Sequence, residues 1–161
     1  MKPTLYMETT IPSYKVARPS LFAPTAAKQA ATAEWWAKRS GDFDIYISRI
    51  VLLECLRGDL AEVEKRRSFL RPFAILETAL EAEHLAAAFL RCGHLPAKAA
   101  DDALHISLAA VHGMHFLLTW NCRHINNVEI LAKLRPVAAG AGFQLPVICT
   151  PEELMGDDYE S

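Results

Sequence analysis

The sequence has no long uninterrupted run of apolar residues and no glycine-, serine- or proline-rich tract. Its first ten residues, MKPTLYMETT, lack the basic, apolar and small-residue order of a secretory signal peptide, and charges interrupt the apolar runs before they reach the length of a membrane span. We therefore expect a cytoplasmic protein with no part in a membrane. The 161 residues, 52% of them hydrophobic, suit one compact domain at residues 1–155, followed by an acidic C-terminal tail at residues 156–161.

Cysteine and glycine motifs are also missing. The four cysteines are scattered and no two form a C-x-x-C pair, so we expect reduced structural thiols rather than a zinc knuckle or a redox centre. No P-loop or G-x-G-x-x-G stretch is present, which disfavours nucleotide cofactors. His112 and His115 form an H-x-x-H pair, but Gly113 interrupts the helix between them, so we expect no zinc there.

A strong basic excess, typical of many nucleic-acid-binding proteins, is absent, because the net charge is −2. The charges are nevertheless unevenly distributed. Five basic residues and one acid lie between residues 15 and 39, whereas five acids and no base lie between residues 152 and 160. Two interpretations stay open: a basic face with an acidic tail, or charges scattered over solvated faces.

Short β-prone apolar segments alternate with longer helical patterns. We expect strands at residues 4–7, 44–47, 73–76, 115–119 and 145–150. We expect helices at residues 23–39, 49–56, 60–70, 80–92, 97–112 and 126–139, and a loop directly after the first strand. Ser48 and Asp59 are expected N-caps, and Pro146 places the last strand at an edge of the sheet. This order favours an α/β fold with three α/β/α layers and a mostly parallel central sheet of four to five strands.

Four polar residues far apart in the sequence are the candidates for a functional site. Glu8 and Asn121 directly follow expected strands, where parallel sheets display their sites. Glu54 in IVLLECL and Asp102 in AADDALHISLAA lie among apolar residues, where an unpaired carboxylate is costly. Three acids around one point repel one another unless a divalent cation lies between them. Mg²⁺ prefers such oxygen ligands and Mn²⁺ serves similarly, so the pattern predicts a metal site for phosphodiester hydrolysis.

Each residue alone has a simpler explanation. Glu54 fits a helix residue paired with Arg49 or Arg57, and Asn121 fits a turn former. Tyr14 and Trp120, beside the expected site, suit either base stacking or packing.

Asp101 and Asp102 point about 100° apart on a helix, so only one of them can face a site. We choose Asp102, because it shares a helix face with Ile106 and Ala109. His105 lies one turn further on and suits a phosphate contact, the orientation of a carboxylate, or an ordinary structural role.

Three segments resemble the PIN domains, specifically the compact VapC-like toxins and their solitary relatives. They are LYMETTIPSY with its strand-terminal acid, ISRIVLLECLRGD with its serine and glutamate, and ADDALHISLAAVHGMHFLLTWNCRHI, which is similar to the family's D-A-L-x-I-A-x-A helix, strand and T-x-N turn. The resemblance implies that Glu8, Glu54 and Asp102 are metal-site acids, with Asn121 at the fourth position.

The resemblance further implies a Mg²⁺-dependent ribonuclease, often paired with an antitoxin and often homodimeric. Ser48 and Thr119 are similar to hydroxyl positions that support the site. The remaining supporting or RNA-contacting candidates are Thr9, Asp101, His105, Lys15, Arg18 and Arg57.

Three departures from the family pattern bear on activity. Glu8 replaces a commoner aspartate, Asn121 offers a carbonyl oxygen without charge, and His124 stands where a further aspartate is often found. The leading hypothesis is an endoribonuclease, either a VapC-like toxin or a solitary relative. The alternatives are a catalytically silent PIN-like module that binds RNA or protein, and a different Mg²⁺ phosphohydrolase acting on a small phosphate ester.

Overall fold

The computed structural model describes residues 1–93 and 95–156, and within these ranges five strands form one sheet. The strands are β1 (Thr4–Met7), β2 (Asp44–Ser48), β3 (Ala74–Leu76), β4 (Phe116–Leu118) and β5 (Val147–Cys149). Their order is β3-β2-β1-β4-β5, and every neighbouring pair is parallel. The expected α/β class and parallel sheet are confirmed, with β5 at an edge as Pro146 predicts.

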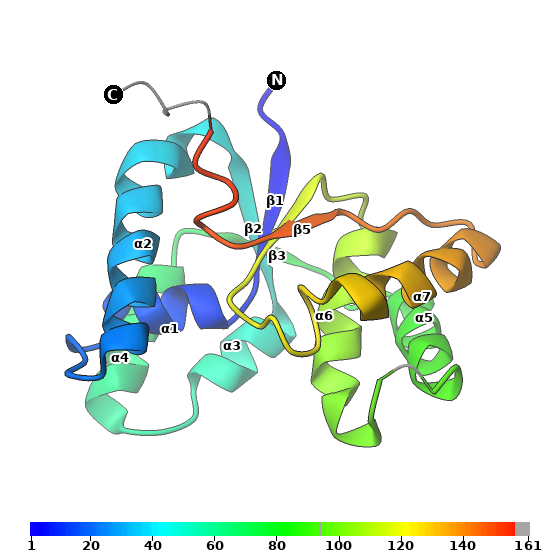
Figure 1. The fold of residues 1–161 in the computed structure, drawn as a ribbon, viewed down its shortest axis with the longest axis horizontal. Helices are drawn as coiled ribbons and strands as arrows, with labels where there is room; N and C mark the ends of the chain where they lie inside the picture. Colours follow the sequence, from blue (N-terminus) through cyan, green and yellow to red (C-terminus); the bar gives the residue numbers. More distant parts are fainter. Residues whose placement is uncertain (94, 157–161) are drawn as a thin grey trace.

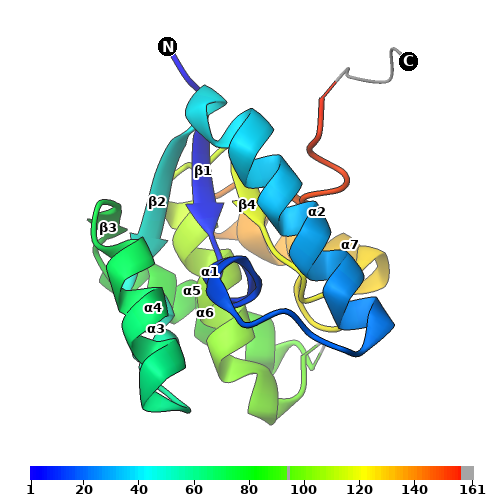
Figure 2. The same ribbon diagram turned by 90° about the vertical axis from the view of Figure 1, so that its left-hand side faces the viewer.

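Helices cover both faces of this sheet (Figure 1). They are α1 (Thr10–Val16), α2 (Ala23–Arg39), α3 (Arg49–Cys55), α4 (Leu60–Leu70), α5 (Leu80–Arg91), α6 (Ala100–Val111) and α7 (Val128–Gly140). One face carries α1, α2 and α4, and the other carries α5, α6 and α7, whereas α3 continues directly from β2 (Figure 2). Short 3₁₀ turns at Ser40–Asp42 and Ala97–Ala99 precede β2 and α6.

The segment after β1 differs from its expected form. We expected a loop there, but α1 begins at Thr10. Pro12 is tolerated because it lies in the first turn, where backbone N–H groups have no partner within the helix. Ile11 and Pro12 are buried and α1 packs against α2 and α4, so tertiary packing stabilises a helix too short to be recognised from its own residues.

The two expected N-caps behave differently. Asp59 accepts a hydrogen bond from the Glu62 backbone N–H at 3.3 Å and caps α4 as expected. Ser48 holds the N-cap position of α3, but its hydroxyl makes no capping hydrogen bond and instead lies 2.7 Å from the Tyr6 hydroxyl.

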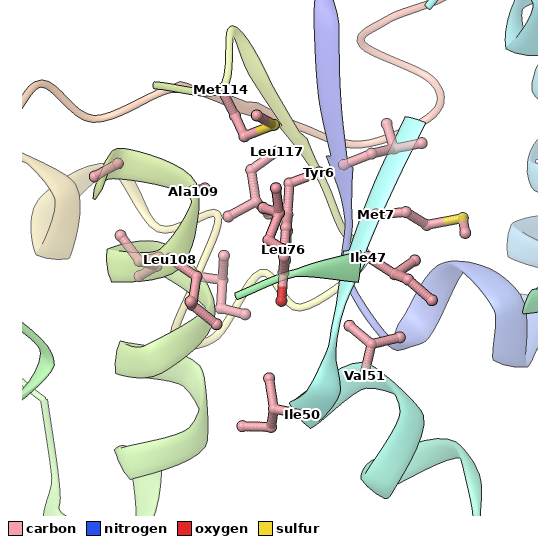
Figure 3. Close-up of a cluster of buried hydrophobic side chains, with 14 of the residues drawn as sticks. Tyr6, Met7, Ile47, Ile50, Val51, Leu76, Leu108, Ala109, Met114 and Leu117 are labelled. Carbon is pink, nitrogen blue, oxygen red and sulfur yellow. The ribbon is translucent and has the colours of Figure 1, made fainter. Parts of the chain in front are cut away.

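The core lies on both sides of the central strand β1. Leu5, Tyr6 and Met7 are all fully buried, as expected for a strand with helices on both faces. Neighbouring side chains point to opposite faces, so Tyr6 faces α6 while Met7 faces the opposite layer (Figure 3). This burial fixes the end of β1, and with it the position of the residue that follows.

All four cysteines are free, with Cys55 and Cys149 buried and Cys92 and Cys122 exposed. Of the helices within the described ranges, none has both the length and the apolar character needed to cross a membrane. Residues 157–161 of the expected acidic tail lie outside the described residues.

Candidate active site

The carboxyl ends of the central strands open into a cavity of about 670 Å³ bordered by α1, α2, α4 and α6. Glu8, Glu54, Asp102 and Asn121 all line this cavity. They come from the end of β1, from α3, from α6 and from the segment after β4. The structure therefore brings together the four residues that the sequence places far apart, at the edge of the sheet where a parallel fold displays its site.

Glu8 is almost fully buried, with 4% of its surface exposed. Its backbone N–H donates to the Leu118 carbonyl at 3.1 Å and continues the pairing of β1 with β4. Its Oε1 atom accepts hydrogen bonds from the Thr119 hydroxyl at 2.7 Å and from the backbone N–H and hydroxyl of Thr10. The Oε2 atom has no hydrogen-bond partner among the described residues, so one oxygen of this carboxylate is fixed and the other is available to the cavity.

Glu54 is held by two side chains. Its Oε1 atom accepts a hydrogen bond from the Thr9 hydroxyl at 2.7 Å and lies 2.6 Å from Nε2 of the fully buried His105. Burial alone would raise the pKa of Glu54, but the hydrogen bond and charge of His105 and the Thr9 hydroxyl hold it below its usual value. Glu54 is thus an ionised group, and its partner is His105 rather than the Arg49 or Arg57 of the simpler explanation.

His105 connects this carboxylate to the interior of the sheet. Its Nδ1 atom lies 2.6 Å from the Tyr6 hydroxyl, which lies 2.7 Å from Ser48 Oγ. Burial alone would lower the pKa of His105, but the hydrogen bond to Glu54 and the surrounding carboxylates raise it above its usual value. Burial raises the pKa of Tyr6 well above its usual value, so this phenol stays protonated.

Asp102 is oriented by the segment after β4. Its Oδ1 atom accepts from the Asn121 side-chain amide at 3.1 Å, and its Oδ2 atom lies 3.0 Å from His124 Nδ1. The Asn121 carbonyl oxygen accepts the backbone N–H groups of Arg123 and His124 at 3.2 and 3.0 Å. Asn121 therefore faces Asp102 with its amide group, whereas the sequence led us to expect its oxygen at a metal. Asp101 is exposed and lines a separate hollow.

The expected RNA-contacting cations lie in three different surroundings. Arg18 lines the cavity, with Nε 3.4 Å from Glu62 Oε1. Arg57 lines a neighbouring hollow of about 240 Å³, which Glu54 also borders. The Lys15 ammonium lies 5.8 Å from the centroid of the Phe69 ring, in α1 rather than in a loop.

The two aromatic candidates also lie in different surroundings. Trp120 is buried and donates its indole N–H to the Thr32 hydroxyl at 2.8 Å, so it packs rather than presents a face to a base. Tyr14 lines the cavity with its ring edge-on to Trp120.

Sequence reasoning missed the roles of Tyr6 and Thr10. Thr10 bonds Glu8 and accepts the Trp120 backbone N–H at 2.8 Å, which ties the end of β1 to the segment after β4. A hydroxyl two residues after a site acid is a usable signal for Thr10. For Tyr6, the signal is a polar atom inside an otherwise apolar strand, since a buried hydroxyl needs a partner.

The side chains around the cavity offer mainly oxygen donors to a metal ion. Across the described residues, no three His, Cys, Asp or Glu side chains are close enough to hold a metal among themselves. The available donors are carboxylate oxygens, Oε2 of Glu8 and Oε2 of Glu54 in particular. This set fits Mg²⁺, which takes one or two carboxylates and retains several waters, and does not fit zinc, which prefers closed nitrogen and sulfur sites.

A family model described as PIN domain matches residues 22–128, and the chain belongs to this family. The match includes Glu54, Asp102 and Asn121, whereas Glu8 precedes it. The resemblance inferred from the three motifs is thereby confirmed at the level of the PIN domain.

A solved structure shares the fold. It is a chain in the crystal structure of VapBC2 from Rickettsia felis bound to a DNA fragment from their promoter, with a TM-score of 0.55 and 18% sequence identity. The alignment covers 91% of this chain and 98% of that chain. No curated protein matches the sequence.

Proposed function

We propose that this protein is a Mg²⁺-dependent endoribonuclease that hydrolyses RNA phosphodiester bonds, acting as the VapC-like toxin of a toxin–antitoxin pair. The main support is the convergence of Glu8, Glu54 and Asp102 on one cavity at the carboxyl ends of the strands. Side-chain exposures of 21% for Glu54 and 19% for Asp102 leave both acids reachable from solvent.

Glu8 and Glu54 would hold the ion through their unpaired oxygens, with Asp102 beside them and Asn121 and His124 orienting Asp102. A bound Mg²⁺ or Mn²⁺ would supply charge stabilisation for the phosphate and a more acidic water. Thr9, Thr10 and Thr119 keep the carboxylates in place by donating hydroxyl hydrogens to them.

The partners in this proposal are RNA, a small antitoxin and a second copy of the chain, all in the cytoplasm. The shared fold with a chain of a VapBC2 assembly supports the antitoxin. A short reading frame for a DNA-binding antitoxin directly upstream of the gene would favour the toxin over a solitary nuclease.

The deciding experiment compares Asp102→Asn with Asp101→Asn. Asp101 is the matched control, because it carries the same charge one residue away and does not line the cavity in the described structure. With Mg²⁺ or Mn²⁺, we expect wild type and Asp101→Asn to cleave RNA, and Asp102→Asn or EDTA to abolish cleavage. Equal cleavage by the two variants, or cleavage that persists in EDTA, would contradict the proposal.

A catalytically silent binding module is the second candidate. The observation that favours it is the engagement of both Asp102 oxygens by Asn121 and His124, neither of which adds a negative charge. Wild-type protein that binds RNA or a partner protein but cleaves no RNA with either metal would establish this alternative.

A further inference from the structure

A continuous chain of hydrogen bonds runs from the buried face of the sheet to the cavity. It begins at Ser48 Oγ and passes through the Tyr6 hydroxyl, the two ring nitrogens of His105 and Glu54 Oε1, at successive distances of 2.7, 2.6 and 2.6 Å. Ser48, Tyr6 and His105 are each 0% exposed. Figure 3 shows the Tyr6 hydroxyl pointing toward the end of the sheet where α3 begins. Only the Glu54 end of this chain reaches solvent.

Packing alone does not account for these side chains. Tyr6 lies between Leu5 and Met7, and His105 lies beside Ile106 in the most apolar helix of the fold. Apolar residues would fill the same positions without polar atoms that need partners. The presence of polar side chains at these positions is therefore explained by the Glu54 carboxylate, to which their hydrogen bonds lead.

The chemistry of the acceptor sets the direction of the last bond in the chain. A carboxylate only accepts, so His105 Nε2–H donates to Glu54. His105 Nδ1 contacts the Tyr6 hydroxyl, which also contacts Ser48 Oγ. His105 and Tyr6 therefore each have one partner on either side, which fixes the ring plane of His105.

Glu54 needs such support because of its position. It lies in the last turn of α3, a helix of seven residues, where a side chain has considerable rotational freedom. His105 and Thr9 both hold Oε1, which leaves Oε2 as the oxygen that faces the cavity without a partner among the described side chains.

We propose that Tyr6 and His105 are positioning residues that fix the Glu54 carboxylate so that its second oxygen is presented to the metal. The proposal rests on the metal site of the proposed function. Neither residue touches the metal or the substrate in this role, and both act through Glu54. Outer hydrogen-bond partners of metal ligands commonly control metal affinity in this way.

The test uses three variants and a control in the full chain. His105→Leu removes both ring nitrogens, and His105→Gln keeps one amide donor for Glu54 and one carbonyl acceptor for Tyr6. Tyr6→Phe removes a single oxygen at nearly constant volume. His112→Gln is the control, because His112 Nε2 lies 2.7 Å from the Glu77 carbonyl and His112 does not line the described wall of the cavity.

Mg²⁺ affinity is measured by calorimetry, and the melting temperature is measured in EDTA and at a fixed Mg²⁺ concentration a few times the wild-type dissociation constant. We expect His105→Leu to weaken Mg²⁺ binding by about tenfold to a hundredfold and to remove most of the Mg²⁺-dependent rise in melting temperature. His105→Gln should recover most of the affinity, Tyr6→Phe should lie between the two, and His112→Gln should match wild type.

A purely structural role gives a different result. It would lower the melting temperature equally in EDTA and Mg²⁺ and leave Mg²⁺ affinity unchanged, which would overturn the proposal. If His105→Leu does not fold, the same comparison is made with Tyr6→Phe and His105→Gln. Wild-type Mg²⁺ affinity in Tyr6→Phe would then overturn the positioning role.

Wild-type protein that binds no Mg²⁺ would refute the proposed function instead. The positioning role is then decided by metal-free crystal structures of wild type and Tyr6→Phe. A displaced Glu54 carboxylate in the variant supports the role, and an unchanged carboxylate overturns it.

Discussion

The Asn121 side-chain amide donates to Asp102 Oδ1 at 3.1 Å, while the Asn121 carbonyl oxygen accepts two backbone N–H groups of its own turn. The residue thereby fixes an acid without adding a charge. An aspartate at the same position would keep the turn but present a second carboxylate to Asp102. We therefore expect an aspartate here to make the stability of the site depend more strongly on a bound cation.

Asn121→Asp is expected to destabilise the metal-free protein and to make its stability depend strongly on Mg²⁺. Two carboxylates in contact raise each other's pKa, and one pKa unit corresponds to about 1.4 kcal/mol. Melting temperatures in EDTA and in Mg²⁺ measure the effect. Asn126→Asp is the control. The Asn126 side-chain amide donates to Glu153 at 2.8 Å, and Asn126 does not line the cavity in the described structure. Mg²⁺ should therefore not restore the stability that this variant loses. An Asn121→Asp protein as stable as wild type in EDTA would contradict the prediction.

Glu8→Gln should fold with wild-type or greater stability in EDTA and lose the stabilisation by Mg²⁺. A glutamine carbonyl can still accept the hydrogen bonds from Thr10 and Thr119, while the charge on the free oxygen is gone. Differential scanning calorimetry with and without Mg²⁺ checks both parts. A full Mg²⁺-dependent rise in melting temperature in Glu8→Gln would exclude Glu8 as a ligand.

Arg57→Gln should weaken RNA binding and reduce the slope of log affinity against log salt by about 0.7 to 1, the effect of one lost phosphate contact. Arg57 is exposed beside Glu54 in the neighbouring hollow. The matched control is Arg91→Gln, because Arg91 lines a separate hollow between α5 and the segment after α7. Binding of a non-cleavable RNA at several salt concentrations gives the slopes, and identical slopes for the two variants would place the RNA elsewhere.

Two of the four thiols should react rapidly with a thiol reagent in the native protein. Cys92 and Cys122 are exposed, and we expect Cys92 to react first because partial burial raises the pKa of Cys122. Burial raises the pKa of both Cys55 and Cys149 to about 12. The thiolate is the reactive form, so the buried pair should react only as fast as the chain unfolds. Mass spectrometry of partially labelled protein assigns the sites, and fast labelling of Cys149 would contradict the packing of β5.

Asn127→Ala should lower the free energy of unfolding by about 1 kcal/mol, the usual cost of a lost N-cap. The Asn127 side-chain oxygen accepts the backbone N–H groups of Glu129 and Ile130, both at 3.1 Å, at the start of α7. Urea denaturation with an unchanged m-value measures the loss. Asn127→Asp, which keeps an acceptor, should retain most of the stability, and an equal loss in both variants would point to another cause.

Local patterns predicted most of this fold. The alternation of β-prone and helical segments predicted the parallel sheet, and Pro146 predicted an edge strand, because both depend on properties of neighbouring residues. The same patterns missed α1, whose seven residues include Pro12 and which is stabilised by buried Ile11 rather than by intrinsic propensity.

The site was predictable in its members and less so in their orientation. Glu8 and Asn121 follow strands, and Glu54 and Asp102 interrupt apolar helices, so their convergence follows from sheet geometry. The contact of Tyr6 with His105 joins residues separated by 99 positions, and no local pattern indicates it. The rotation of Asn121 depends on which backbone N–H groups its turn leaves unpaired, which requires the folded turn itself.

The position of β1 in the sheet also affects how the chain is made. The central strand β1 is synthesised before both of its neighbours, β2 and β4, so its second edge stays open until residues 116–118 have been synthesised. The hydrogen bond from Thr119 to Glu8 also forms only after Thr119 has been synthesised. The contacts that orient Asp102 likewise require Asn121 and His124. A nascent chain therefore cannot present a complete set of oriented carboxylates until residues 119–124 have been synthesised and have folded against the earlier strands.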